Sequence, residues 1–405
     1  MSPEVTAAII AVSGVVLTVI ATVAVQISGR RATSRDTQKA LEEQREQLNT
    51  TLAAQHEQLD RTLAEQRTRT LNERFATAAG QLGGDKPPAV RLAGVYAMSG
   101  LADDWPENRQ TCADVLCAYL RLPYAPDPGN DASVQEQLDF RASREVRHTV
   151  IRVIAAHLSD GAAVSWQGLS FDFNGVVFDG GDFRGAVFSG GLAVFDGAEF
   201  SSGTVRFNGA KFSGGEVFFG GAKFSGGKIR FARAEFSGGT VSFRDIELSS
   251  GTVDFGRAHF TGGTVLFHGA RFAGGTVSFA GAAFSGGEIR FRAAEFSGAL
   301  VRFAAITFSG ATVSFADARF SGGDVAFTNV TFSSGDVAFT NAAFSGSAVS
   351  FYGARFSGGT VDFHAEFTGG EVDFSDPGDW SSPPAFPWTD TPAPAVRLPQ
   401  NEDQP

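Results

Sequence analysis

Few side chains in this sequence could carry out chemistry, and they are scattered. Cys112 and Cys117 are its two cysteines. Thiolates act as nucleophiles and metal ligands, but five residues apart on a helix these two would point about 140° from each other. That geometry is poor for a shared metal ion, and two thiols do not make a disulfide framework for 405 residues. We therefore interpret both as small core residues.

The remaining candidates give no stronger signal of catalysis. His148 and His157 have no companions at metal-ligand spacing. The sequence contains no G-x-S-x-G, P-loop, HExxH or paired-cysteine motif. We therefore predict no catalytic, cofactor-binding or metal-binding residues and no cofactor, and expect that the protein is not an enzyme.

One stripe of basic residues has two interpretations. Arg141, Arg144, His148 and Arg152 recur along one side of a predicted helix. The stripe could bind an anionic partner such as lipid headgroups. The alternative, which we favour, is a solvated helix face whose basic side chains pair with nearby carboxylates.

These residues lie in a predicted all-α module over residues 72–160. Pro106 suits the first turn of a helix, and apolar residues follow it at helical spacing. A loop rich in Pro, Asp, Gly and Ser then precedes a last helix. The pattern predicts three or four helices, with two buried stripes: Cys112, Val115, Leu116, Tyr119 and Leu120, then Val146, Val150, Val153, Ile154 and Leu158.

An uncharged stretch near the amino terminus predicts a transmembrane helix. Residues 5–27 contain no charged side chain over 23 positions, enough for a helix of about 35 Å across a hydrocarbon core of about 30 Å. The preceding residues 1–4 carry no Lys or Arg, whereas Arg30, Arg31 and Arg35 follow. Because positive charge stays on the cytoplasmic side, we expect a single-pass plasma-membrane protein with residues 1–4 outside and the later domains in the cytoplasm.

A polar helical stalk is predicted for residues 28–71. Two eleven-residue segments align, 43–53 and 54–64, with Leu48 matching Leu59 and Leu52 matching Leu63. An eleven-residue period predicts weak right-handed supercoiling. The thin leucine seam favours a coiled coil that makes a homo-oligomer; a lone helical spacer is the other interpretation.

Short repeats dominate the second half of the chain. Fourteen units of twelve residues run from Phe188 to Phe356, each reading roughly F-S-G-G-x-V-x-F-x-x-A-x. Before them, Phe173, Phe178, Phe183 and Phe188 are spaced by five. Such a short period is typical of stacked copies of one small structural step, which gives a rod with a surface and no cleft.

The five-residue spacing resembles the pentapeptide-repeat family, with Val176–Phe178 and Ala186–Phe188 as inward pairs and Gly181 as a small substitute before Phe183. The runs ERFATAAGQLGG, AVRLAGVYAMSGLADD and DVLCAYLRLPY also resemble a segment of bacterial membrane-anchored members. The resemblance implies a right-handed quadrilateral β-helix, here at residues 165–375, and no catalytic residues. The family generally lacks an assigned activity. Some soluble members mimic duplex DNA and bind a topoisomerase, but this chain departs from them in its anchor and in outward cations such as Arg206, Arg230, Arg290 and Arg302.

The twelve-residue unit allows two models of the rod. In the favoured model, two units make a coil of about 24 residues. Such a coil has eight inward side chains, with Val217, Phe219, Ala222 and Phe224 contributed by one unit. In the other model, each unit is a flat coil, which two Phe, a Val and an Ala would crowd. At about 4.8 Å per coil, fourteen units would be about 34 Å long in the first model and about 67 Å in the second.

Residues 376–405 are rich in proline and predict a disordered or loosely docked tail, in which Trp380 and Trp388 could cover the end of the rod. The net charge of −11 includes −8 from residues 161–405, which hold 16 Lys and Arg against 24 Asp and Glu; this weighs against nucleic acid as a partner. We expect a membrane-tethered scaffold that presents its rod to an unknown protein partner. The alternative is a DNA mimic that acts on a topoisomerase.

Overall fold

The computed structural model describes residues 34–125, 127–389 and 391–400. The predicted membrane helix at 5–27 and the residues before it lie outside this part. Among the helices that the structure describes, none is both long and apolar enough to cross a membrane. The chain divides into two units, Met1–Thr70 and Leu71–Pro405, and each is described by itself.

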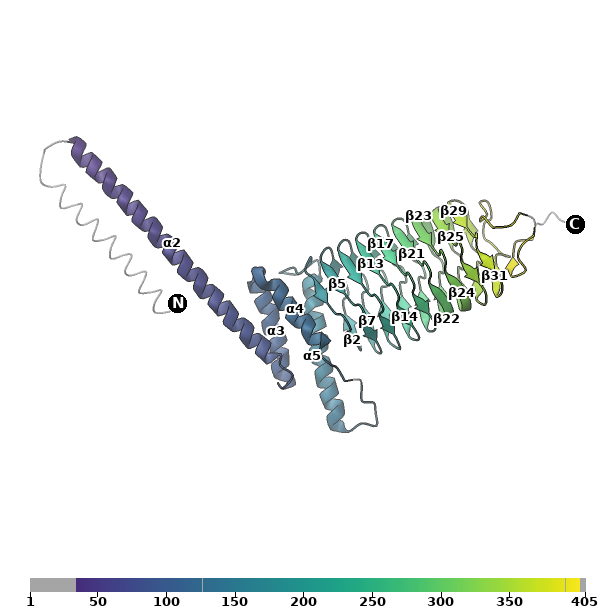
Figure 1. Cartoon of the computed structure of the whole chain (residues 1–405), viewed down its shortest axis with the longest axis horizontal. Coiled ribbons are helices and arrows are strands. Elements are labelled where there is room, and N and C mark those ends of the chain that lie inside the picture. Colours follow the sequence, from purple (N-terminus) through teal and green to yellow (C-terminus); the bar gives the residue numbers. More distant parts are fainter. Residues whose placement is uncertain (1–33, 126, 390, 401–405) are drawn as a thin grey trace. The chain divides into compact units, whose positions relative to one another are not determined.

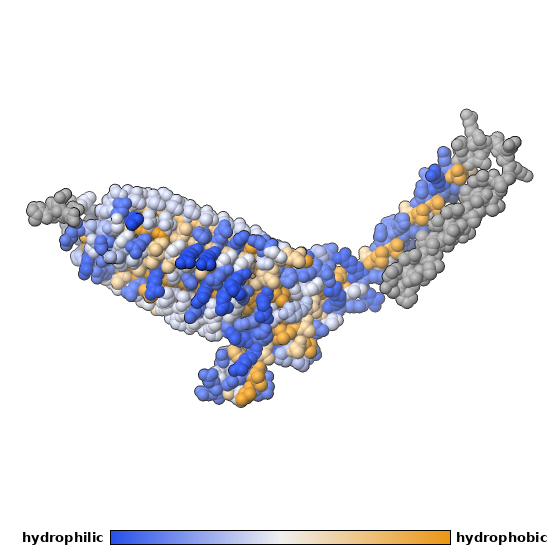
Figure 2. Space-filling view, turned by 180° about the vertical axis from the view of Figure 1, so that it is seen from behind, coloured by the Kyte–Doolittle hydropathy of each residue, from blue (hydrophilic) through white to orange (hydrophobic). Residues whose placement is uncertain are grey.

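The first unit contains most of helix α2 (Ser34–Gln81). Its surface is polar, and threonine hydroxyls such as that of Thr62 donate hydrogen bonds to the carbonyl four residues earlier. The leucines of the predicted seam are exposed or half-buried, with Leu41 and Leu63 46% and 44% exposed. Figure 2 shows apolar residues recurring along this helix between hydrophilic ones. A helical stalk is therefore present from Ser34, and its pairing with a second copy stays a prediction.

The second unit begins with a small helical module. It consists of the end of α2, then α3 (Pro88–Asp104), the 3-10 helix η1 (Pro106–Asn108), α4 (Arg109–Arg121) and α5 (Val134–Leu158). A capping box between Ser133 and Glu136 begins α5. Both predicted apolar stripes face the core, with only Val115 half-buried. Cys112 and Cys117 are free thiols with no exposed surface, as their interpretation as core residues requires.

The solenoid follows the module, and its coils run toward the carboxyl terminus (Figure 1). Each coil has four sides, and the strands of each side form a parallel ladder. The first ladder is β1 (Phe171–Asp172), β5 (Leu192–Val194), β9 (Glu216–Phe218), β13 (Thr240–Ser242), β17 (Thr264–Leu266), β21 (Glu288–Arg290), β23 (Thr307–Ser314), β25 (Thr331–Ala338) and β29 (Thr360–Asp362). The second is β2 (Val177–Phe178), β6 (Glu199–Phe200), β10 (Lys223–Phe224), β14 (Glu247–Leu248), β18 (Arg271–Phe272), β22 (Glu295–Arg302), β24 (Arg319–Ala326), β26 (Ala343–Phe344) and β30 (Glu366–Phe367).

The other two sides share some of these strands, because β22 to β25 each extend across a corner onto a second side. The third ladder adds β3 (Gly181–Asp182), β7 (Thr204–Arg206), β11 (Lys228–Arg230), β15 (Thr252–Asp254), β19 (Thr276–Ser278), β27 (Ala348–Ser350), β31 (Glu371–Asp373) and β32 (Val396–Arg397). The fourth adds β4 (Val187–Phe188), β8 (Lys211–Phe212), β12 (Glu235–Phe236), β16 (His259–Phe260), β20 (Ala283–Phe284) and β28 (Arg355–Phe356).

The register decides between the two models of the rod. Glu235 pairs with Lys211 on one side and with His259 on the other, so each strand meets its equivalent two repeat units away in both directions. The coil made of two units is therefore confirmed, and the coil made of one unit is wrong. Near the carboxyl end, Phe344 pairs with Phe367, so the residue missing from the repeat makes that coil shorter by one.

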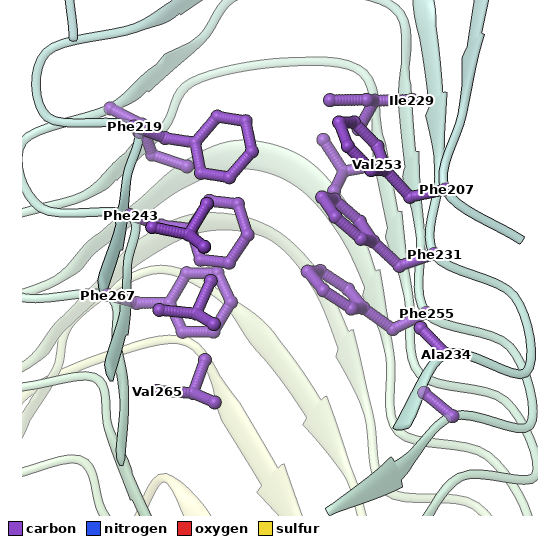
Figure 3. Packing of buried hydrophobic residues seen from close by; sticks show 14 of the residues in the cluster. Phe207, Phe219, Ile229, Phe231, Ala234, Phe243, Val253, Phe255, Val265 and Phe267 are labelled. Atoms are coloured by element: carbon purple, nitrogen blue, oxygen red, sulfur yellow. The ribbon is translucent and has the colours of Figure 1, made fainter. Parts of the chain in front are cut away.

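Phenylalanine rings fill the interior of the coils. Phe243 stacks between Phe219 and Phe267 at 4.8 and 4.9 Å between ring centroids. It also meets Phe255 from the opposite side edge-on, at 5.7 Å and 89°. Figure 3 shows these two facing stacks together with Ile229, Val253, Val265 and Ala234 of the same core. The predicted inward positions are confirmed, since Val217, Phe219, Ala222, Phe224 and their equivalents are at most 2% exposed in the central coils.

The two glycines at the corners let consecutive coils approach closely. A Cβ at Gly239 would overlap the carbonyl oxygen of Gly215 in the preceding coil, and its φ is +66°. Gly209 has a similar φ of +64°, but nothing lies within 4 Å of the position that its Cβ would take. A left-handed corner glycine such as Gly239 is thus constrained by the backbone of the neighbouring coil, whereas Gly209 is constrained only by its own conformation. Where Ala299, Ala311 and Ser347 occupy the equivalent corner, the residue does not have a positive φ.

We therefore expect Gly239→Ala to lower the free energy of unfolding by about 3 kcal/mol, from steric overlap and the left-handed backbone together. Gly209→Ala should cost only about 1 kcal/mol, because Ala305 occupies the equivalent turn four coils later with φ +51°. Thermal unfolding of the two variants compares them directly, and equal losses would contradict the close-approach explanation.

Both ends of the solenoid are covered. At the amino-terminal end, α4 packs against β1 and α5 against β3. At the other end, Trp380 lies edge-on to Phe356, Phe386 stacks on Phe363, and Trp388 meets Phe367. The described part of residues 376–400 thus continues the coil, with β32 pairing β31. This differs from the disordered tail that the proline content predicts, while the predicted cover by Trp380 and Trp388 is present.

Candidate binding surfaces

Because the interior is filled, the solenoid can interact only through its outward side chains. One outward column alternates in charge sign over six consecutive coils: Glu199, Lys223, Glu247, Arg271, Glu295 and Arg319. Glu295 lies 3.7 Å from Arg271 and 3.4 Å from Arg319. These side chains are well exposed, so each pair stabilises the fold by less than about 1 kcal/mol. The positive and negative charges within this column therefore balance each other.

In a second region, side chains of like charge lie next to each other on consecutive coils. Arg206 is in register with Arg230 on the next coil, so like charges sit directly opposite each other. At the adjoining turn, Arg233 donates its backbone N–H to Gly256, and Arg257 follows one coil after Arg233. Together with Lys228, we call these five exposed residues the basic corner. Within the described part of the chain, none of the five side chains lies at ion-pair distance from an acidic one.

The basic corner borders a shallow groove of about 480 Å³. Its floor consists of small turn residues from consecutive coils, Gly209, Ala232, Gly256 and Ala280, and Arg233 and Arg257 line it. Both arginines have left-handed backbones, with φ of 60° and 58°, which costs roughly 1 kcal/mol each relative to glycine. Alanine adopts the same conformation at Ala305, so the fold tolerates this cost and does not require arginine.

The predicted basic stripe lies at the junction between the module and the solenoid. Arg144 Nε is 2.9 Å from Asp179 Oδ2, and His148 Nε2 is 2.9 Å from Asp179 Oδ1. Arg152 instead pairs with Glu145 on its own helix, and Arg141 is exposed. Three of the four residues therefore lie next to carboxylates, as the favoured interpretation predicted. That interpretation placed them on a solvated face, whereas Arg144 and His148 contact the largely buried Asp179 at a packed junction.

Two further residues complete this junction. Tyr124 donates its hydroxyl to Asp179 Oδ2 at 2.8 Å. Arg147 is 5% exposed, bonds to the carbonyls of Leu120 and Val177, and stacks over the Tyr124 ring at 4.2 Å. Sequence reasoning missed Arg147 and Asp179. A charged residue at an apolar helix position, between Val146 and Val150, was the available signal for Arg147.

The electrostatics of Asp179 follow from these contacts. Burial alone would raise the pKa of its carboxyl. Hydrogen bonds from His148 and Tyr124, together with the charges of His148 and Arg144, outweigh burial and hold that pKa below its ordinary value. Burial also raises the pKa of Cys112 to about 11 and that of Cys117 to about 12, so neither thiol is an activated nucleophile.

Two other polar features belong to the helical module. His157 Nε2 lies 3.2 Å from Asp103, which also accepts a hydrogen bond from the Trp166 indole, and the two rings stack at 4.1 Å. This arrangement joins α3, α5 and the start of the solenoid. A cavity of about 540 Å³ opens beside Arg91, Tyr119 and Phe140. Across the described ranges, no three or more His, Cys, Asp or Glu side chains come together as a metal site.

Comparison with known proteins bears on the solenoid alone. The family model described as Pentapeptide repeats (9 copies) matches residues 173–216. This stretch holds the phenylalanines spaced by five and the first of the twelve-residue units. The chain is therefore a repeat protein that contains pentapeptide repeats, folded as a β-solenoid behind a small helical module. No curated protein and no solved structure matches it.

Proposed function

We propose that this protein is a non-enzymatic scaffold that binds other proteins through the outward surface of its solenoid. The observation that carries the proposal is the filled interior: rings stack without interruption from Phe195 to Phe363, and both ends are covered. What varies from coil to coil is the outward charge pattern. Figure 2 shows hydrophilic side chains gathered midway along one face of the solenoid, beside pale and apolar areas.

The proposal includes a membrane tether and an oligomeric stalk. The uncharged residues 5–27 would anchor the chain in the plasma membrane, with the solenoid in the cytoplasm. Alkaline phosphatase is active only after export, so activity from a carboxyl-terminal fusion would contradict the predicted orientation. The seam at Leu41, Leu48, Leu52, Leu59 and Leu63 would pair with a second copy, because its side chains stay partly or well exposed on a single helix. Light scattering of the full chain in detergent measures the assembly.

Proximity labelling in the native host tests the scaffold role. A biotin ligase fused after residue 405 should label a reproducible set of proteins. The matched control carries the ligase after residue 70, so it keeps the anchor and stalk and lacks the module and solenoid. We expect several proteins to be enriched at least about tenfold with the full chain. An identical labelled set in both samples would contradict a binding role for the solenoid.

Nucleic-acid mimicry of a topoisomerase substrate is the alternative. A mimic of duplex DNA needs continuous rows of acidic side chains. The column from Glu199 to Arg319 alternates in sign, and Arg206, Arg230, Arg233 and Arg257 gather at one corner. These charges favour a protein-binding surface over such a mimic.

A further inference from the structure

We infer that the basic corner binds an acidic segment of a partner protein. The inference rests on the proposed function, and it names the chemistry of the partner and the place where it docks. The corner comprises Arg206, Lys228, Arg230, Arg233 and Arg257 with the adjoining groove.

The contrast between columns of the same solenoid supports an external partner. Where Glu199, Lys223 and Glu247 stack, each charge meets its opposite on the next coil. At the basic corner, arginine meets arginine in two adjoining columns. Repulsion between neighbouring cations is unfavourable unless an anion lies between them. In the column of Arg206 and Arg230, the chain itself supplies Asp182 and Asp254 on the outer sides. The turn column of Arg233 and Arg257 is flanked by Gly209 and Gly281 instead, so a counter-charge for that column would come from another molecule.

Three acidic groups lie around the corner, and none of them is at ion-pair distance from Arg233 or Arg257. Asp182, in register with Arg206, pairs with Arg184 at 2.7 Å. Asp254, in register with Arg230, accepts a hydrogen bond from the backbone N–H of Gly256. Glu235 lies on the next side, between Lys211 and His259. These groups temper the positive potential and leave the guanidinium groups of Arg233 and Arg257 open to a ligand.

The groove fits a carboxylate. Guanidinium groups bind carboxylates through two parallel hydrogen bonds, and Arg233 and Arg257 are one coil apart, about 4.8 Å along the axis. One carboxylate could therefore contact both. The floor of Gly209, Ala232, Gly256 and Ala280 carries no large side chain, so an extended backbone can lie close to the solenoid.

The size of the site favours a short acidic peptide over a long polyanion. The groove reaches from Gly209 to Ala280, four consecutive coils. Beyond the corner, the neighbouring side presents Glu235, and the solenoid and tail together carry a net charge of −8 from 16 basic and 24 acidic residues. A nucleic-acid duplex would extend past the corner and meet this acidic surface.

The test uses variants that the repeat itself supplies. Arg233→Gly and Arg257→Gly install the residue found at Gly209 and Gly281 in the same turns, so the double variant should fold at least as well as the wild type. The control pair, Arg244→Gly with Arg292→Ala, removes the same charge from the other row of turns, where Gly220 and Ala316 are the natural equivalents. Melting curves of both variants, compared with that of the wild type, check that the fold is kept.

Binding is measured by fluorescence anisotropy with the full chain in non-ionic detergent. The probes are a labelled peptide of eight glutamates, its glutamine counterpart and a short DNA duplex. We expect the glutamate peptide alone to bind, with a Kd about tenfold higher for the Arg233/Arg257 variant and little changed for the control variant. Binding should weaken as salt rises.

Three results would overturn the inference: no binding of the glutamate peptide, equal losses in the two variants, or tighter binding of the duplex than of the peptide. If proximity labelling finds partners while the glutamate peptide does not bind, the scaffold role stands and only the acidic-segment inference fails. If the peptide binds and no partner is labelled, the proposed function fails independently.

Discussion

Phe267→Asp should destabilise the solenoid so strongly that it unfolds well below the melting temperature of the wild type. The ring is 1% exposed and stacks between Phe243 and Phe291 at 4.9 and 4.6 Å. Phe255 and Phe279 meet it edge-on from the opposite side. A carboxylate placed there has no polar partner, and truncation of a buried Phe alone costs about 3–5 kcal/mol.

The position of Phe267 adds to this loss. Each coil contacts only its neighbours, so stability is close to a sum of coil and interface terms. A disrupted coil in the middle separates the two halves of the ring stacks. We expect the melting temperature, followed by far-UV circular dichroism, to fall by at least about 10 °C.

Phe267→Leu is the matched control. Leu248 takes the place of a phenylalanine at another inward position and is fully buried, so the solenoid accommodates leucine inside. This control should lose only about 1 kcal/mol. A melting curve of Phe267→Asp that coincides with the wild type would mean that this ring does not lie in the core.

The interior of the solenoid was predictable because each inward side chain stacks on its equivalent in the next coil, which keeps the spacing of the phenylalanines regular. Alternating spacings of seven and five place Phe212, Phe219, Phe224 and Phe231 inward. Side-chain volume disfavours a coil made of a single unit, and the register excludes it. The residue missing before Phe367 is visible in the spacing of the repeat, and the register shows that its coil is shorter by one residue. Local sequence sufficed because each inward residue meets its own equivalent one coil away.

The parts that sequence reasoning missed depend on contacts without a period. Asp179 reads as an ordinary outward residue of the repeat, and only the docking of α5 brings Arg144 and His148 to it. The sequence left open whether the tail is disordered or docked, because proline content reports only a backbone preference. The docking depends on the apolar end of the solenoid that Trp380 and Trp388 cover. The basic corner needed the register, since it joins cations that lie two repeat units apart in the sequence.

Asp179→Asn should loosen the junction between the module and the solenoid by about 2–4 kcal/mol at pH 7. The carboxylate is 9% exposed and accepts bonds from Arg144 and Tyr124, with His148 at 2.9 Å. An asparagine keeps the size and one acceptor, but it leaves Arg144 without its counter-charge. The carboxylate is largely buried although Arg144 is 42% exposed, and removing the charge of a buried carboxylate with three polar partners is destabilising for this reason. Faster hydrogen exchange of the α5 amides would report the loosening.

The loss should depend on pH in a defined direction. Because the folded pKa of Asp179 lies below its unfolded value, its contribution is fully present above about pH 4. It disappears as pH falls through the folded pKa, where the native carboxylate takes up a proton. The difference in unfolding free energy between wild type and Asp179→Asn should therefore shrink as the pH falls below about 4.

Asp160→Asn separates this effect from the loss of any acidic residue at the same end of the solenoid. Asp160 pairs with Lys211 at 2.7 Å, but its side chain is 61% exposed. Solvent screening leaves such an exposed pair with little net contribution to stability. The two substitutions change charge equally, so a greater loss for Asp179→Asn isolates the role of burial and of the three partners. Equal losses would mean that Asp179 contributes only as a surface charge, and that apolar contacts of α4 and α5 hold the module in place.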